Sequence, residues 1–192
     1  MELLKQKILT EGRLLNGYVL KVDNFLNHQL DVKLLDAMGS AFAERFSGIK
    51  IDKILTIEAS GIAIATMASQ HFGYPPVIFA KKTKSLTLDA EAYEAEVHSY
   101  TKQENYKIRV SRRYLQPNEN ILIVDDFLAH GHAIRGLASI VKQAGGNIAG
   151  VGIAIDKSFQ GGAKLVQKDL GLRLESLIKL KSIDNGRIEF VE

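Results

Sequence analysis

Residues 121–133 read ILIVDDFLAHGHA, and this stretch decides the fold class that the sequence predicts. Its first four residues are apolar and predict a buried strand, with Asp125 and Asp126 at the carboxyl end. A loop containing Gly131 follows, and we expect a helix over residues 132–144. In open α/β sheets, ligands bind beyond the carboxyl ends of the strands. The same stretch therefore predicts where a ligand site lies.

The residue types in this stretch suit a phosphorylated sugar. A helix N-terminus offers backbone N–H groups and the positive end of the helix dipole to a phosphate, and Gly131 lets the backbone approach the anion closely. Asp125 and Asp126 suit sugar hydroxyl groups and a hydrated Mg²⁺ ion, which prefers oxygen ligands. The plainer interpretation is that two aspartates end a strand and cap a helix. The apolar run before them and the glycine loop after them favour the ligand site.

Apolar strands and amphipathic helices alternate along much of the chain. Strands are predicted near residues 53–57, 77–80 and 148–155, and helices near 34–46, 62–72 and 164–169. This alternation predicts an α/β fold with a central parallel sheet flanked by helices. Residues 84–115 are more polar, and their period of two predicts an antiparallel hairpin.

The two ends of the chain are expected to form a small hood over the strand ends. A helix is predicted from Leu3 to Leu15, ended by Gly17, with an irregular loop at residues 18–30 and Asp31 as the next N-cap. Late strands are expected near residues 174–180 and 187–191. The chain is thus one predicted domain, residues 1–192, with a core at about 37–165 and hood segments at about 1–36 and 166–192.

Composition excludes several classes of site. The chain has 192 residues and no cysteine, so it can form no disulfide, thiolate nucleophile or cysteine-ligated zinc site. Its net charge of +3 gives no case for a dedicated nucleic-acid binder. No apolar run is long enough to span a bilayer, and the first ten residues lack the apolar centre of a signal peptide. We expect a cytoplasmic protein without membrane or nucleic-acid partners.

Residues 121–133 resemble the phosphoribosyl-diphosphate (PRPP) motif of the type I phosphoribosyltransferases. The match lies in the apolar run, the acidic pair and Gly131, whereas His130 and Ala133 stand where the family commonly has Thr or Ser. Residues 56–61 resemble the diphosphate loop of the family, and residues 79–87 resemble the basic strand and flexible loop of its purine-specific members. The resemblance implies PRPP contacts from Ala59, Ser60, Lys81, Lys82, Ala129, His130, Gly131, His132 and Ala133.

Within that family, the pattern is most similar to the bacterial xanthine phosphoribosyltransferases. Residues 20–29 resemble their hood segment and residues 155–159 their base-binding segment, which implies base contacts from Leu20, Asn27 and Lys157. An ammonium group has only donors, so Lys157 suits the 6-oxo group of a purine and opposes the amino group of adenine. Phe159 is a candidate for stacking on the base, although Phe at that spacing is as often a core residue.

The resemblance implies transfer of ribose 5-phosphate from PRPP to xanthine, with Mg²⁺ as the cofactor and a homodimer as the assembly. Asp125 and Asp126 are the catalytic and metal-binding candidates, directly or through water; Glu58 is a weaker candidate. Guanine or hypoxanthine as the base, or a PRPP-binding regulator without catalysis, remain alternatives. The histidines flanking Gly131 superficially resemble metal ligands, but a phosphate loop explains their spacing better. His28, His71 and His98 are expected to be surface or packing residues.

Overall fold

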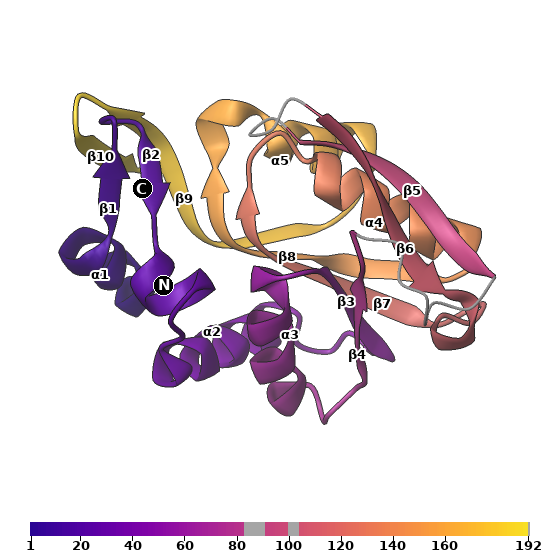
Figure 1. Ribbon diagram of the computed structural model, residues 1–192. Coiled ribbons are helices and arrows are strands. Elements are labelled where there is room, and N and C mark those ends of the chain that lie inside the picture. Colours follow the sequence, from indigo (N-terminus) through magenta and orange to yellow (C-terminus); the bar gives the residue numbers. More distant parts are fainter. Residues whose placement is uncertain (83–90, 100–103, 192) are drawn as a thin grey trace.

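A computed structural model describes residues 1–82, 91–99 and 104–191. At its centre is a six-stranded sheet with the strand order β10-β9-β8-β7-β3-β4 (Figure 1). All neighbouring strands run parallel except β10, which is antiparallel to β9. The predicted α/β fold with a mostly parallel sheet is confirmed. The strands are β3 (Lys53–Ile57), β4 (Val77–Ala80), β7 (Asn120–Leu128), β8 (Asn147–Lys157), β9 (Leu174–Asp184) and β10 (Arg187–Phe190).

The sheet is buried on both faces, which is why its central strands are almost wholly apolar. On one face, α2 (Val32–Arg45) and α3 (Ser60–His71) pack against Leu122 and Val124 of β7. On the other face, α4 (His132–Gln143) packs against Ile121 and Ile123. Successive residues of β7 thus enter opposite core clusters, as the alternation of side chains along a strand requires.

The predicted antiparallel hairpin is β5 (Ala92–Ser99) with β6 (Glu104–Ser111), and it lies over α4 (Figure 1). Gly136 of α4 makes this approach possible, because a Cβ atom there would lie 2.6 Å from Cγ2 of Val97. Residues 83–90 lie outside the described residues; they include the start of the predicted hairpin segment and the part of the predicted basic strand and flexible loop (79–87) that follows Lys82.

The two ends of the chain lie side by side (Figure 1). The N-terminal amino group of Met1 donates to the Leu177 carbonyl at 3.1 Å, and the Gly186 N–H donates to the Gly17 carbonyl at 3.3 Å. The division into core and hood segments stays a prediction. The N-terminal elements are α1 (Glu2–Glu11), β1 (Arg13–Leu15), β2 (Val19–Lys21) and a π-helical turn at Asp23–Asn27.

The predicted first helix was too long. It ends at Glu11, because Gly12 is extended (φ −66°, ψ 143°) and the chain turns into β1. Asn16 and Gly17 then have positive φ values of 52° and 81° and form the turn between β1 and β2. Asn-Gly is a strong signal for such a hairpin turn, so the helical spacing of the leucines was the weaker guide. The expected N-cap Asp31 is confirmed, with the Leu34 N–H donating to its Oδ1 at 3.0 Å.

Two strands extend further than the sequence indicated. β7 continues to Leu128, pairing Asp125 with Ile153 and Phe127 with Ile155, so the acidic pair lies within the strand rather than after it. β8 continues to Lys157. The ladder between the two strands satisfies the backbone groups of the polar residues, which is why polarity did not end either strand.

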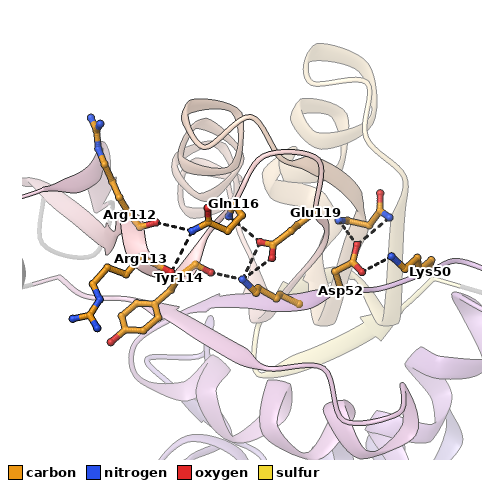
Figure 2. A network of polar contacts seen from close by, with 9 residues as sticks. Lys50, Asp52, Arg112, Arg113, Tyr114, Gln116 and Glu119 are labelled. Carbon is orange, nitrogen blue, oxygen red and sulfur yellow. Dashed lines mark hydrogen bonds and ion pairs between the residues drawn. The ribbon is translucent and has the colours of Figure 1, made fainter.

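A polar network fixes the opposite, amino-terminal end of β3 and β7 (Figure 2). Lys53 donates to the Tyr114 carbonyl at 2.8 Å and forms an ion pair with Glu119 at 2.7 Å. Asp52 accepts the Asn120 N–H at 2.8 Å and pairs with Lys50 at 2.7 Å. These contacts connect the start of β3 to the segment before β7, and they lie at the end of the sheet away from the acidic pair.

Candidate active site

Asp125 and Asp126 form the centre of the candidate site. The Asp126 N–H donates to Oδ1 of Asp125 at 3.0 Å, and the Phe127 N–H donates to Oδ1 of Asp126 at 2.8 Å. Burial, and then the charge of Asp126, raise the pKa of Asp125 well above its ordinary value, while Lys82 acts in the opposite direction. Asp125 is only 5% exposed and Asp126 is partly exposed. The two carboxyl groups therefore differ in environment, and Asp126 is the more accessible to a ligand.

The loop before α4 has the form of an anion site. Gly131 has φ +83° and immediately precedes the helix, and a Cβ atom there would lie 3.2 Å from Cδ2 of Leu165. The Ala129 carbonyl accepts the Gly162 N–H at 3.0 Å, which fixes the other side of the loop. The first N–H groups of α4 have no partner within the helix and are suited to a phosphate. Residues 129–133, including His132 and Ala133 of the first turn, surround this helix end.

The predicted diphosphate loop joins β3 to α3 and contains Ala59 and Ser60, with a cis peptide between Glu58 and Ala59. The Glu58 N–H donates to the Ala80 carbonyl at 3.2 Å, and the Glu58 carboxylate accepts the N–H of Lys82. Glu58 thus orders the junction between this loop and the end of β4. This position agrees with an ordering role better than with a reactive one.

Lys81 and Lys82 were both predicted to contact PRPP, but their surroundings differ. Lys82 acts on the pKa of Asp125, and its Nζ lies 5.6 Å from the ring centroid of Tyr106. Lys81 instead forms a backbone bridge with Arg109 and lines a cavity of about 650 Å³ beside β4 with Phe79. Lys82 is therefore the one brought to the acidic pair, while Lys81 faces the edge of the sheet.

Lys157, the predicted base-binding cation, lies beside Phe127. Its Nζ is 4.9 Å from the Phe127 ring centroid, a distance typical of a cation–π contact. Burial lowers the pKa of Lys157, and the charge of Asp126 opposes that effect. Lys157 therefore lies within electrostatic range of the acidic pair. Phe159 is 47% exposed two residues further on.

Leu20 and Asn27 are the other two predicted base contacts. Leu20 is 5% exposed and belongs to the core cluster around α2, and Asn27 is exposed at the end of the π-helical turn. In the part of the chain that the structure describes, no hydrogen bond joins either residue to Lys157. Their base-binding role stays a prediction.

Sequence reasoning missed Phe127, Tyr106 and Thr56. Burial, and then the charge of Asp125, raise the pKa of Tyr106, which lies on β6 opposite Val97. The period of two in the hairpin already put Tyr106 on the inward face. Thr56 is fully buried near the end of β3, and among the described residues its Oγ1 has no hydrogen-bond partner. Nothing local in the sequence marked Phe127 or Thr56, because their importance depends on residues far away in the chain.

The site combines two carboxylates, a helix N-terminus, the partly buried Lys157 and the exposed Lys82 at the carboxyl ends of the parallel strands. Carboxylate oxygens of this kind fit Mg²⁺, which binds through one or two carboxylates together with water and substrate phosphates. Among residues 1–82, 91–99 and 104–191, no group of three or more His, Cys, Asp or Glu side chains could hold a metal ion by itself. No helix in the described ranges is long and apolar enough to cross a membrane.

The chain is similar in sequence and in fold to known phosphoribosyltransferases. Residues 22–169 match the family described as phosphoribosyl transferase domain. The xanthine phosphoribosyltransferase of Laribacter hongkongensis is 61% identical over 190 residues, covering 99% of this chain and 100% of that protein. The xanthine phosphoribosyltransferase of Clostridioides difficile is 53% identical with the same coverage. The crystal structure of adenine phosphoribosyltransferase from Rhodothermus marinus, 18% identical, has a TM-score of 0.76 over 94% of this chain and 100% of that one, which shows the fold alone.

Proposed function

Because the chain belongs to the phosphoribosyl transferase domain family, we propose that it transfers the ribose 5-phosphate unit of PRPP to xanthine. The products are xanthosine 5′-monophosphate and diphosphate, and the enzyme serves purine salvage. One observation carries this proposal: the acidic pair, the loop before α4 and Lys157 lie together at the carboxyl ends of the parallel strands. Relatives that are 53% and 61% identical over their full length and carry the name xanthine phosphoribosyltransferase support the choice of base.

The phosphorylated substrate is held at three places. The backbone N–H groups at the start of α4 bind the 5′-phosphate. Ala59, Ser60 and Lys82 bind the diphosphate, since loop amides and a cation are the complementary groups for that anion. Asp126, the more exposed carboxylate, accepts hydrogen bonds from the ribose hydroxyl groups, with Asp125 behind it.

Breaking the bond to diphosphate builds positive charge on the sugar, as in glycoside cleavage. The carboxylates of Asp125 and Asp126 stabilise that charge, and the backbone N–H groups of the diphosphate loop together with Lys82 stabilise the leaving group. Mg²⁺, held by Asp126 and Asp125 directly or through water, would neutralise charge on the phosphate oxygens when bound. Much of the remaining rate enhancement comes from holding base and sugar in the reacting orientation.

Lys157 selects the base in this proposal. Its ammonium donates to the 6-oxo group of xanthine and would leave the amino group of adenine without an acceptor. Asn27, Leu20 and Phe159 complete the base site. We also propose that the enzyme is cytoplasmic and acts as a homodimer.

A base-discrimination assay tests the function. The protein is mixed with PRPP, Mg²⁺ and one of xanthine, guanine, hypoxanthine or adenine, and nucleotide formation is followed. We expect the highest kcat/KM with xanthine and loss of activity on chelation of the metal. Another preferred base would overturn the choice of xanthine while leaving the transferase intact. PRPP binding without transfer to any base would favour a regulator.

A pair of variants tests the role of Lys157. Lys157→Met keeps most of the length of the side chain but removes its ammonium group, and a hydrogen bond from a charged group contributes about 1.5–3 kcal/mol. We expect kcat/KM for xanthine to fall by roughly 10- to 150-fold, whereas the affinity for PRPP stays within about threefold. Lys33→Met on the exposed surface of α2 is the matched control. Equal losses in both variants would contradict the assignment.

A further inference from the structure

Three imidazole rings gather beside the phosphate loop. His130 and His132 flank Gly131, and their ring centroids are 6.2 Å apart. His98 comes from a different element, β5 of the hairpin, and its ring is edge-on to that of His132 with centroids 6.0 Å apart. The hairpin therefore brings a third histidine to the helix end where the 5′-phosphate is proposed to bind.

The orientation of His98 is fixed by a short chain of hydrogen bonds. Its Nδ1 lies 2.7 Å from Oδ1 of Asn105, and the Asn105 amide group donates to Glu96 Oε1 at 2.6 Å. Because the amide nitrogen of Asn105 faces Glu96, its oxygen faces the ring, so Nδ1 of His98 carries the hydrogen and donates it.

The surroundings of His132 disfavour its charged form when no anion is bound. Burial lowers the pKa of His132 most. Three neighbours lower it further: Arg135 on the same helix, His130 on the loop and His98 on β5. These three neighbours are bases, and the positive end of the α4 dipole acts in the same direction. A phosphate dianion at the start of α4 would reverse this balance, because a nearby negative charge favours imidazolium.

The loop itself leaves imidazole as its main side-chain donor. Residues 129–133 read Ala-His-Gly-His-Ala and contain no hydroxyl group. A neutral imidazole donates one hydrogen bond, whereas imidazolium donates two and carries a charge. Within the described ranges, these histidines belong to no group that could hold a metal ion. An anion is therefore the ligand that suits the cluster.

On the basis of the proposed function, we propose that His98, His130 and His132 form a proton-linked clamp for the 5′-phosphate of PRPP. His130 and His132 act at the phosphate, and His98 is a positioning residue that acts through His132. Binding of PRPP then takes up a proton in the neutral range, and affinity falls as the pH rises.

Calorimetry of PRPP binding without base tests this directly. Titrations in buffers of different ionisation enthalpy give the number of protons taken up, and titrations from pH 7 to 8.5 give the pH dependence of Kd. For one linked proton, Kd should rise about tenfold for each pH unit above the pKa of the free cluster. The phosphate is already a dianion in this range, since its second pKa is about 6. Inorganic diphosphate, which lacks the 5′-phosphate, gives the background.

Three variants separate the roles. His132→Gln should reduce proton uptake with PRPP and flatten the pH dependence, while the uptake measured with diphosphate is unchanged. His98→Gln should keep the uptake but move the rise in Kd to higher pH, because it removes one base beside His132. His71→Gln removes a histidine that pairs with Asp36 at 2.8 Å, away from the loop, and should behave as the wild type.

The outcomes distinguish this inference from the proposed function. No binding of PRPP by the wild type would overturn the proposed function. PRPP binding without proton uptake, or with the same uptake in wild type and His132→Gln, would overturn the clamp and leave the transferase standing. A normal pH profile in His98→Gln would remove His98 from the clamp. Thermal unfolding of each variant checks that it is folded.

Discussion

Replacing Gly61 with alanine should destabilise the protein, although alanine is normally favoured in a helix. A Cβ atom at position 61 would lie 2.0 Å from Oγ1 of Thr56, about 1 Å closer than real Cβ atoms come. Thr56 is fully buried and stiff at χ1. Overpacking of this kind costs about 1–3 kcal/mol, against a gain of at most about 1 kcal/mol from helix propensity. The clash should win, with a net loss of about 1–2 kcal/mol.

A double-mutant cycle with Thr56→Ala isolates the clash. Thr56→Ala removes a buried methyl group, worth about 1 kcal/mol, and a buried hydroxyl without a partner, whose removal is favourable by a similar amount. That variant alone should be within about 1 kcal/mol of the wild type. Combined with Gly61→Ala it should recover most of the lost stability, with a coupling energy of about 1–3 kcal/mol.

Urea and thermal unfolding measure the cycle. Gly61→Ala should lower Tm by about 2–8 °C at 2–4 °C per kcal/mol and raise KM for PRPP, because α3 begins in the diphosphate loop. Gly39→Ala is the control: its Cβ would lie 2.9 Å from the Cα atom of Ala68, so Thr56→Ala should not rescue it. A Gly61→Ala protein as stable as the wild type, or a cycle with zero coupling, would refute the reasoning.

Three further predictions follow from buried or paired groups. Asp156 is fully buried, and burial raises its pKa. Because the folded-state pKa exceeds the unfolded value of about 3.9, the wild type loses stability as pH rises from that value through the folded pKa. The gain in Tm of Asp156→Asn over the wild type should therefore be larger at pH 7 than at pH 4, and the reverse trend would contradict the sign. Asp31→Ala should destabilise the protein by about 1 kcal/mol because it removes the N-cap of α2. Asp31→Asn should retain most of the cap but lose the 2.9 Å ion pair with Lys7. Urea unfolding of both variants measures the two effects. Phe127→Leu should raise KM for xanthine several-fold more than KM for PRPP, because it removes the aromatic face beside Lys157; steady-state kinetics with equal changes in both would argue against it.

The parallel core could be predicted because its strands are buried on both faces. Residues 121–124 are apolar without interruption and residues 53–57 are almost wholly apolar, and such runs bounded by turn signals leave few alternatives. The antiparallel hairpin could be predicted from its period of two, whereas its register comes from the structure. The predicted end of the first helix was wrong because the spacing of the leucines fits a helix as well as a short hairpin, and the Asn16-Gly17 turn decides between them.

In the candidate site, local signals were readable and tertiary ones were not. Gly131 before a helix and an acidic pair after an apolar run can be identified from neighbours in the chain. Which of Lys81 and Lys82 lies near Asp125 depends on how the end of β4 meets β6, which no local pattern encodes. The pairing of Lys157 with Phe127 likewise depends on two neighbouring parallel strands. His98 was expected to be a surface or packing residue because His132, whose ring it contacts, is more than thirty residues away in the chain.

The length of β9 has a mechanical consequence. Leu180 pairs with Lys157 of β8 on one side and with Phe190 of β10 on the other, so one strand is shared by the main sheet and the C-terminal hairpin. A shared strand is stiff, and a rigid-body rotation of the terminal segments would have to break or bend its ladder. Ordering of the terminal segments by a ligand should therefore slow hydrogen exchange along the whole of β9 as one cooperative unit. When this end of the molecule opens, we expect the strands to separate progressively from the edge of the sheet, not the terminal segments to rotate as a rigid body.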